Sequence, residues 1–334
     1  MSSLTTSATR QRAQHGYYVH LTSTQLFHAT AQVDSDFSSS PDLIDPVAPL
    51  SGSKRLTTQY TINDDVCPPT DPNVLDKTVR KNCRSLSTFL SKKPIAAHTR
   101  AAFDQIQPIV DSYSKASGSI ILDSGCGTAR STVLLAETFP DKFVIGVDRS
   151  FVRLVQNAKS RGDDDEDDVA EEESDDSSAP SSSLRPYYQV IAENAIIVRA
   201  ELVDFWRCIL QEKRWNVEQH YLFYPNPYPT KQRLKQRFYA HPGFPLILQL
   251  RGDITVRSNW EGYLKEFAKS VEIADSYYSE EESQEDDEVN VARPYLAAAK
   301  VGPKERTDKT IGWTNFERKY DQVGEPTYEL ILKM

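Results

Sequence analysis

A turn containing two glycines directly follows an apolar segment near residue 120. The segment 120–122 is short and apolar, as in a buried strand, and the turn Asp-Ser-Gly-Cys-Gly-Thr begins at Asp123. Residues 131–139 then have the apolar pattern of a helix. Gly125 and Gly127 allow a ligand to approach the backbone closely. The turn therefore predicts a small-molecule site between a strand and a helix.

The acid that opens this turn indicates the kind of ligand. A dinucleotide-binding turn has a third glycine, which would fall at Ala129 or Arg130 here. A carboxylate at Asp123 instead fits the ammonium group of S-adenosylmethionine. Asp148 ends the next apolar segment, where its two oxygens can accept two ribose hydroxyls, and Glu201 follows the third, where it can accept from an adenine amino group. We predict an S-adenosylmethionine site; the alternative is a similar domain with an ordinary turn and surface acids.

Strand-like and helix-like segments alternate from residue 119 onward, which predicts a parallel sheet with right-handed crossovers. This is an α/β fold: a Rossmann-like, doubly wound, mostly parallel sheet with its ligand at the carboxyl ends of the strands. The expected strands are 120–122, 143–147, 195–200, 221–224, 254–257 and 328–332, and the expected helices are 131–139, about 203–212 and about 261–274.

Three regions are expected along the chain. Residues 1–53 are rich in Ser and Thr and poor in acids, which is typical either of a disordered segment or of an organelle-targeting peptide. Residues 54–118 form a lead-in that packs on the main domain, 119–334. Two acidic tracts interrupt that domain, at about 162–183 and 279–290, and their composition predicts disordered inserts.

The formal net charge of -9 hides a basic remainder. Residues 163–176 hold 11 acids and residues 280–288 hold 7, so the rest of the chain has 39 Lys and Arg against 30 Asp and Glu. Such an excess is expected of a protein that binds a polyanion, although ordinary surface charge gives the same balance. No apolar run is long enough to span a membrane, and the four cysteines lack metal or disulfide spacing. We expect no metal, no membrane and an intracellular location, in cytoplasm or nucleus.

A rigid, polar loop, Tyr-Pro-Asn-Pro-Tyr-Pro at 224–229, follows the fourth expected strand. In one interpretation, Asn226 belongs to a loop similar to the Asn-Pro-Pro-Tyr loop of amino-methylating enzymes, with one proline fewer. In the other, the loop leads into a cluster of cations that bind phosphates. A solvated helix face would give the same run of cations. The cluster consists of Lys231, Arg233, Lys235 and Arg237.

Six motifs follow one another along the chain. They are the glycine turn, the acid ending the second strand, Asn194 with Glu201, the 224–229 loop before basic residues, Ser258-Asn259-Trp260 with Tyr263, and Thr314-Asn315-Phe316-Glu317. In this order they resemble the tRNA (guanine-N7)-methyltransferase family over roughly residues 119–332, less the two acidic inserts. The glycine turn is shared by many methyltransferases, whereas the last three motifs are specific to this family.

The resemblance implies roles by position. Asn226 stands where the family has its catalytic aspartate, in Pro-Asp-Pro-Trp, and Asn259 stands where it has a substrate-contacting aspartate. The family lysine four residues after the catalytic position corresponds to Thr230, with Lys231 one residue further on. These departures indicate a divergent branch. The residues that match the family's substrate-binding motif are Thr314, Asn315, Phe316 and Glu317.

The activity that the resemblance implies is methyl transfer from S-adenosylmethionine to a guanine N7 in tRNA. Guanine N7 has a lone pair and no proton, so the reaction requires alignment and no base. The alternatives are methylation of another structured RNA or of a protein or exocyclic amine, and a non-catalytic RNA-binding relative. Whether a partner subunit is needed stays open. Trp260, Tyr263 and Phe316 are expected in the core, and His220 as a buried histidine that binds no ligand.

Overall fold

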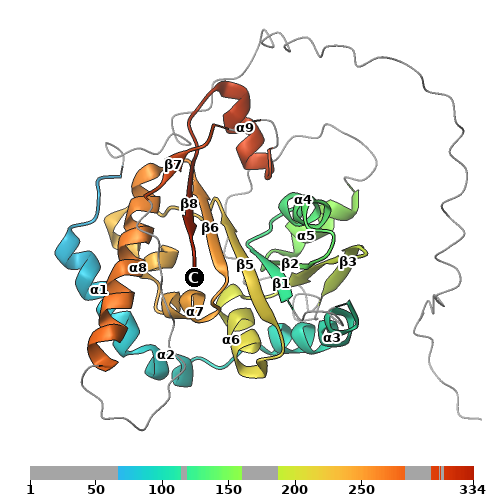
Figure 1. Ribbon diagram of the computed structural model, residues 1–334, viewed down its shortest axis with the longest axis horizontal. Coiled ribbons are helices and arrows are strands. Elements are labelled where there is room, and N and C mark those ends of the chain that lie inside the picture. The colour runs from blue at the N-terminus through green and yellow to red at the C-terminus, as the bar shows by residue number, and fades with distance from the viewer. Residues whose placement is uncertain (1–66, 114–118, 160–186, 283–301, 308, 310–311) are drawn as a thin grey trace, which may run out of the picture. The chain divides into compact units, whose positions relative to one another are not determined.

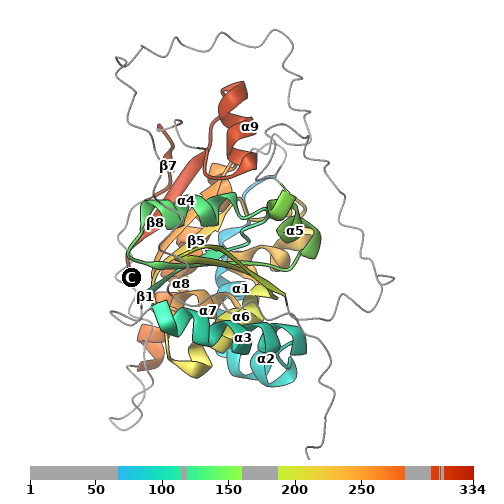
Figure 2. The same ribbon diagram turned by 90° about the vertical axis from the view of Figure 1, so that its right-hand side faces the viewer.

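A computed structural model describes the chain in several stretches (Figures 1 and 2). The N-terminal segment 1–53 and the first acidic insert, 162–183, lie outside the described residues, as does the second insert from residue 283 on. The described residues are 67–113, 119–159, 187–282, 302–307, 309 and 312–334.

The centre of the fold is an eight-stranded sheet in the order β3-β4-β2-β1-β5-β6-β8-β7. The pairs β4–β2, β2–β1, β1–β5 and β5–β6 are parallel, whereas β3–β4, β6–β8 and β8–β7 are antiparallel. This confirms the predicted Rossmann-like, mostly parallel sheet. The strands are β1 (Ser119–Ser124), β2 (Phe143–Asp148), β3 (Tyr188–Ala192), β4 (Ala195–Arg199), β5 (Asn216–Phe223), β6 (Asp253–Ser258), β7 (Lys304–Glu305) and β8 (Tyr328–Leu332).

Helices cover both faces of the sheet, which explains why its central strands are continuous apolar runs. Alternate residues of each strand enter different cores. Ile120 and Leu122 pack with the helices α1, α3, α6, α7 and α8, whereas Ile121 packs with α4 and α5 (Figure 2). The helices are α1 (Pro72–Arg84), α2 (Leu86–Lys92), α3 (Ala97–Tyr113), α4 (Arg130–Thr138), α5 (Phe151–Lys159), α6 (Leu202–Glu212), α7 (Phe244–Gln249), α8 (Glu261–Glu282) and α9 (Asn315–Val323).

Residues 67–113 supply three helices to the larger core. α1 begins at an Asp71 cap, whose side chain accepts from the N–H groups of Asn73 and Val74. α1 packs on α8 and α3 packs on α6. The first residues of this region also reach the loop after β5, because the Cys67 thiol donates to the carbonyl of Pro229. The lead-in therefore contributes to the edge of the sheet at which the functional loops lie.

Several elements differ from expectation. α8 continues to Glu282, into the second acidic tract, since it packs along α1 and Arg80 pairs with Glu280 at 2.8 Å. β5 begins at Asn216 because neighbouring β1 pairs with its polar first half. The sequence pattern missed α5, α7, α9, β3 and β7. No described helix is long and apolar enough to span a bilayer.

Candidate functional site

The turn between β1 and α4 has the backbone that its glycines predict. Gly125 and Gly127 have φ values of 85° and 57°, a region that L side chains rarely adopt. A Cβ added at either glycine would meet no atom within 4 Å, so open space lies beside the turn. Ala129, the position of the missing third glycine, has a left-handed φ of 63°. The turn is thus shaped for close approach by a ligand.

Close packing of α4 on the sheet is achieved by Gly146 in β2. A Cβ there would lie 2.4 Å from Thr132 Oγ1, 3.0 Å from Thr132 Cγ2 and 3.1 Å from Cys126 Sγ. In a dinucleotide-binding turn, the third glycine gives this close helix–strand contact. Here a glycine of the neighbouring strand does so, and the signal for it was a single glycine inside an apolar strand.

Asp123 is 1% exposed and fixes the start of α4. Its Oδ2 accepts hydrogen bonds from Ser131 Oγ at 2.6 Å and Thr132 Oγ1 at 2.7 Å. Its Oδ1 is buried without a hydrogen-bond partner among the described residues. Burial raises the pKa of Asp123 to about 6. Oδ1 is therefore the one carboxylate atom left for a bound cation.

Asp148 closes the turn from the end of β2. Its Oδ2 accepts from the N–H of Gly127 at 3.0 Å and its Oδ1 accepts from the N–H of Ser150 at 2.8 Å. Each carboxylate oxygen can accept a second hydrogen bond. Glu201 stands at the N-cap of α6 without a side-chain cap hydrogen bond, and its backbone N–H donates to Thr99 Oγ1 at 3.1 Å. The three acids lie at the carboxyl ends of β1, β2 and β4, as expected.

The loop after β5 places an exposed Asn226 between two strained tyrosines. Tyr224 and Tyr228 have φ values of 49° and 42°, which cost conformational energy for residues with a side chain. The Oδ1 of Asn226 accepts a hydrogen bond from the N–H of Tyr228 at 3.1 Å. The Nδ2 of Asn226 has no partner among the described residues. Because Asn226 is exposed, this NH2 group is left to donate to a ligand.

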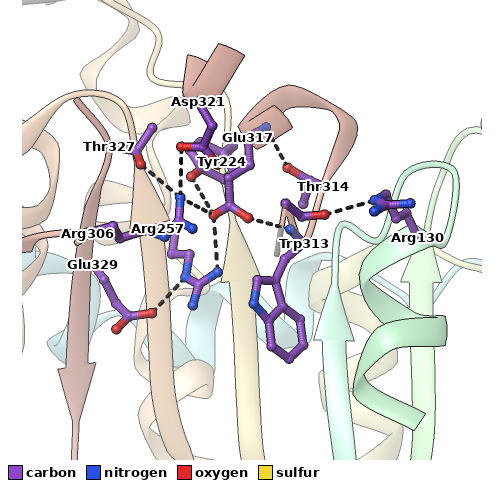
Figure 3. A network of polar contacts seen from close by, with 11 residues as sticks. Arg130, Tyr224, Arg257, Arg306, Trp313, Thr314, Glu317, Asp321, Thr327 and Glu329 are labelled. Carbon is purple, nitrogen blue, oxygen red and sulfur yellow. Dashed lines mark hydrogen bonds and ion pairs between the residues drawn. The ribbon is translucent and has the colours of Figure 1, made fainter. Parts of the chain in front are cut away.

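A buried carboxylate, Glu317, holds the first of these tyrosines (Figure 3). Its side chain is 0% exposed. Its Oε1 accepts from Tyr224 Oη at 2.8 Å, from Arg257 Nη1 at 3.1 Å and from Arg306 Nη1 at 2.8 Å. Its Oε2 accepts from the backbone N–H of Trp313. Burial raises the pKa of Tyr224, so its hydroxyl keeps the proton that it donates.

Arg257 and Arg306 each form a second ion pair, with another acidic side chain. Arg257 Nε lies 2.7 Å from Glu329, and Arg306 Nη1 lies 3.7 Å from Asp321 (Figure 3). The resemblance implies that Glu317 contacts the substrate, but a carboxylate without exposed surface and with four protein donors does not fit that role. We correct the expectation: Glu317 is buried among protein donors, one of which is Tyr224 of the loop after β5.

The segment before α9 connects this network with the glycine turn. Thr314 caps α9, because its Oγ1 accepts a hydrogen bond from the backbone N–H of Glu317 at 3.0 Å. Asn315 Nδ2 donates to Thr128 Oγ1 at 3.4 Å. Arg130 Nε donates to the carbonyl of Gly312 at 2.9 Å, and Figure 3 shows Arg130 directed toward this segment. The predicted residues Thr314 and Asn315 therefore lie between the two parts of the site.

The other predicted asparagine, Asn259, contacts an aromatic side chain of α9. Asn259 Nδ2 donates to the Tyr320 hydroxyl at 2.9 Å, and Phe316 stacks on Tyr320 with ring centroids 4.5 Å apart. Phe316 is half-buried. Trp260 and Tyr263 are 2% and 0% exposed, so both lie in the core as expected.

The basic cluster separates into two groups. Lys231, Arg233 and Lys235 are exposed on the 3₁₀ helix η4 (Lys231–Gln236) and form no ion pair with another described residue. Arg237 is 2% exposed, and all three of its guanidinium nitrogens donate to protein atoms. We therefore correct the prediction that Arg237 binds phosphate, because no surface of its guanidinium is left for an RNA strand.

His220 is 1% exposed in β5 and lies 2.8 Å from Ser124 Oγ through its Nε2. Burial lowers its pKa to about 3, so it is neutral. Asn194 is structural as well, since its Nδ2 donates to three carbonyls around the end of α4. Within the described stretches, no group of His, Cys, Asp or Glu is arranged to hold a metal ion.

Comparison with known proteins identifies the family. The model of the protein family described as "Putative methyltransferase" matches residues 117–330. The chain belongs to this methyltransferase family. The match begins just before β1 and ends in β8, so it contains both the glycine turn and the loop after β5. The family expected from the sequence is confirmed.

Relatives of this methyltransferase are distant. A tRNA (guanine-N(7)-)-methyltransferase of Acinetobacter baylyi is 23% identical over 193 residues, which are 54% of this chain and 67% of that protein. Among solved structures, an antibiotic-related methyltransferase is 12% identical with a TM-score of 0.39, covering 70% of this chain and 94% of that one. The 16S rRNA methyltransferase KamB is 12% identical with a TM-score of 0.36, covering 72% and 96%.

S-adenosylmethionine is the methyl donor of this methyltransferase. The residues around the glycine turn fit it. Open space beside Gly125 and Gly127 would admit its methionine end, and the buried Oδ1 of Asp123, which has no partner among the described residues, would be an acceptor for its ammonium group. Asp148 retains acceptor capacity for ribose hydroxyls at the end of β2.

Proposed function

We propose that this methyltransferase transfers the methyl group to N7 of a guanine in tRNA. Three observations support the proposal. The chain belongs to a methyltransferase family, and its relative in Acinetobacter baylyi is a tRNA (guanine-N(7)-)-methyltransferase. Exposed cations of η4 follow the loop that carries Asn226. They are Lys231, Arg233 and Lys235.

The orientation of the Asn226 amide carries the choice of target atom. Its Oδ1 accepts the Tyr228 N–H at 3.1 Å, which leaves Nδ2 to face a substrate as a donor. The edge of guanine that bears N7 and O6 offers acceptors alone. A donor at Asn226 therefore matches O6 while N7 keeps its lone pair for the methyl group. A target amine would instead require an acceptor for its N–H.

In this proposal, different residues bind the cofactor and orient the guanine. Asp123, Asp148 and Glu201 hold the cofactor, with the glycine turn against its methionine end. Bound there, S-adenosylmethionine supplies an electrophilic methyl group on a sulfonium. Asn226 orients the guanine so that the N7 lone pair points at that methyl group, and no base has to remove a proton.

The remaining residues bind or position the RNA. The three cations of η4 take backbone phosphates, which fix register without reading sequence. Asn259, Thr314, Asn315 and Phe316 line the approach from the side of α9. Glu317 and Arg237 act from beneath the loop, by holding Tyr224 and Tyr228.

One substrate pair tests the target atom. A tRNA transcript made with 7-deazaguanosine in place of guanosine keeps every exocyclic amine but has no N7. Incubation of both transcripts with methyl-labelled cofactor should label the ordinary transcript and leave the 7-deaza transcript unlabelled. Equal labelling of both would contradict the proposal and favour an amine. Binding of RNA without any cofactor binding would favour a non-catalytic relative.

A further inference from the structure

A buried arginine holds the far end of the Asn226 loop. Arg237 Nε donates to the carbonyl of Tyr228 at 3.1 Å, and Arg237 Nη2 donates to Cys67 Sγ at 3.0 Å. Cys67 is 1% exposed, and its thiol donates in turn to the carbonyl of Pro229 at 3.0 Å. Two consecutive carbonyls of the loop are thus fixed by one arginine and one thiol.

The charge of this arginine is balanced beneath the loop. Arg237 Nη1 lies 3.3 Å from Glu266 Oε2 and 2.7 Å from the Tyr239 hydroxyl, which itself donates to Glu266 at 2.6 Å. The backbone N–H and the hydroxyl of Thr70 each donate to Glu266 at 2.7 Å. The guanidinium also lies over the Trp260 ring, 5.0 Å from its centroid. Both oxygens of Glu266 and all nitrogens of Arg237 therefore have partners, as buried ions require.

Strain in the loop gives these contacts a function. Tyr228 has a φ of 42°, and a non-glycine residue keeps such a backbone only where its surroundings hold it. The N–H of the same Tyr228 orients Asn226. Release of the Tyr228 and Pro229 carbonyls would let this turn relax, and the Asn226 amide would move with it.

We infer that Cys67 and Arg237 are positioning residues, which set the place of Asn226 by fixing the carbonyls of Tyr228 and Pro229. The inference rests on the proposed function for its kinetic consequence. It also extends the site beyond the family match, which begins at residue 117, because Cys67 and Thr70 belong to the lead-in. The lead-in is therefore a functional part of the substrate site as well as a packing element.

Substitution of the thiol isolates this role. Cys67→Ala removes the thiol's hydrogen bonds to Pro229 and Arg237, whereas Cys67→Ser restores a donor for Pro229 and an acceptor for Arg237. Cys83→Ala is the matched control, since Cys83 is also buried, at 6% exposed, but lies in α1 beside Tyr278. All three variants should bind the cofactor as the unchanged protein does.

Methyl transfer to tRNA gives the first measurement. A misplacement of about 1 Å costs on the order of a hundredfold in rate, so Cys67→Ala should lower kcat by about ten- to hundredfold with little change in KM. Cys67→Ser should recover most of that loss, and Cys83→Ala should keep the original kcat. An unchanged kcat in Cys67→Ala, or an equal loss in Cys83→Ala, would overturn the inference.

Hydrogen exchange gives a second measurement that does not depend on activity. Loss of the thiol's hydrogen bonds should speed exchange of the Asn226, Tyr228 and Thr230 amides by about tenfold in Cys67→Ala, with β2 unchanged. Unaltered exchange in the loop would refute the inference. If the unchanged protein fails to methylate tRNA but the loop amides respond, the proposed substrate is wrong and the positioning role stands.

Discussion

Gly146→Ala tests the packing that shapes the cofactor turn. The added methyl would lie 2.4 Å from Thr132 Oγ1, a separation that side chains do not tolerate. Overpacking of this kind costs about 1 to 3 kcal/mol. Thr132 would have to rotate, which breaks its 2.7 Å hydrogen bond to Asp123, and a bond to a charged acceptor contributes about 1.5 to 3 kcal/mol. We expect a loss of about 2.5 to 6 kcal/mol in the free energy of unfolding.

Urea denaturation measures this loss, and titration with S-adenosylmethionine measures the accompanying loss of affinity. Gly302→Ala is the control, because a Cβ there meets no atom within 4 Å. The double variant Gly146→Ala/Thr132→Ala removes the clash with Thr132 and leaves the 3.1 Å contact with Cys126 Sγ, so it should be no less stable than Gly146→Ala alone. Equal stability of Gly146→Ala and Gly302→Ala, or strictly additive losses in the double variant, would show that Gly146 does not determine the packing of Thr132.

Three further predictions concern charges of the site. Because burial raises the pKa of Asp123 to about 6 and a cation binds its ionised form, cofactor affinity measured by calorimetry should rise by about tenfold per pH unit below 6 and level off above it. An Asp123→Asn variant with the same pH profile would contradict this. Glu317→Gln leaves two buried arginines short of a counter-charge, so thermal or urea unfolding should show a loss of about 3 to 5 kcal/mol, and a loss below about 1 kcal/mol would count against the buried network. Replacing Lys231, Arg233 and Lys235 by Gln should weaken tRNA binding and flatten its dependence on log salt by about 0.7 to 0.9 for each phosphate that is no longer neutralised; an unchanged slope would remove η4 from the RNA surface.

Local sequence patterns predicted the strands on either side of the glycine turn. The apolar residues of β1 and β2 mark both as strands, although Gly146 lies within β2, and Asp123 and Asp148 lie at their carboxyl ends. The positions of these acids in the fold then follow from parallel pairing, which brings strand ends to one edge of the sheet.

The supports of the loop could not be predicted in this way. Glu317 and Arg237 look like surface charges in the sequence, and each is buried only because partners distant in the chain converge on it. Arg257 and Glu317 are 60 residues apart in the sequence, and Cys67 and Arg237 are 170 residues apart. The periodicity of apolar residues predicts which face of a helix or strand is buried, but it does not predict contacts between residues so far apart in the sequence.

The sequence also failed to predict β3 and the C-terminal end of α8, for a related reason. β3 lies at the edge of the described sheet, and only Ile191 of its five residues is buried. Its apolar run, 190–192, is short and follows polar Gln189, so local composition marks it weakly. The end of α8 is acidic, and its helix is stabilised by packing on α1, to which Arg80 contributes its pair with Glu280. Both elements form because of tertiary contacts, although their local composition does not favour them.

Nucleoside analysis of unmodified tRNA, after incubation with the purified protein and methyl-labelled S-adenosylmethionine, tests the proposed methyl transfer most directly. We expect labelled 7-methylguanosine. It should be absent with Asp148→Ala, which loses the cofactor, and with Asn226→Ala, which loses the alignment of the guanine. The second variant should still bind the cofactor. Label in a nucleoside methylated on an exocyclic amine would show that N7 is not the target, and full activity of Asn226→Ala would show that Asn226 does not align the guanine.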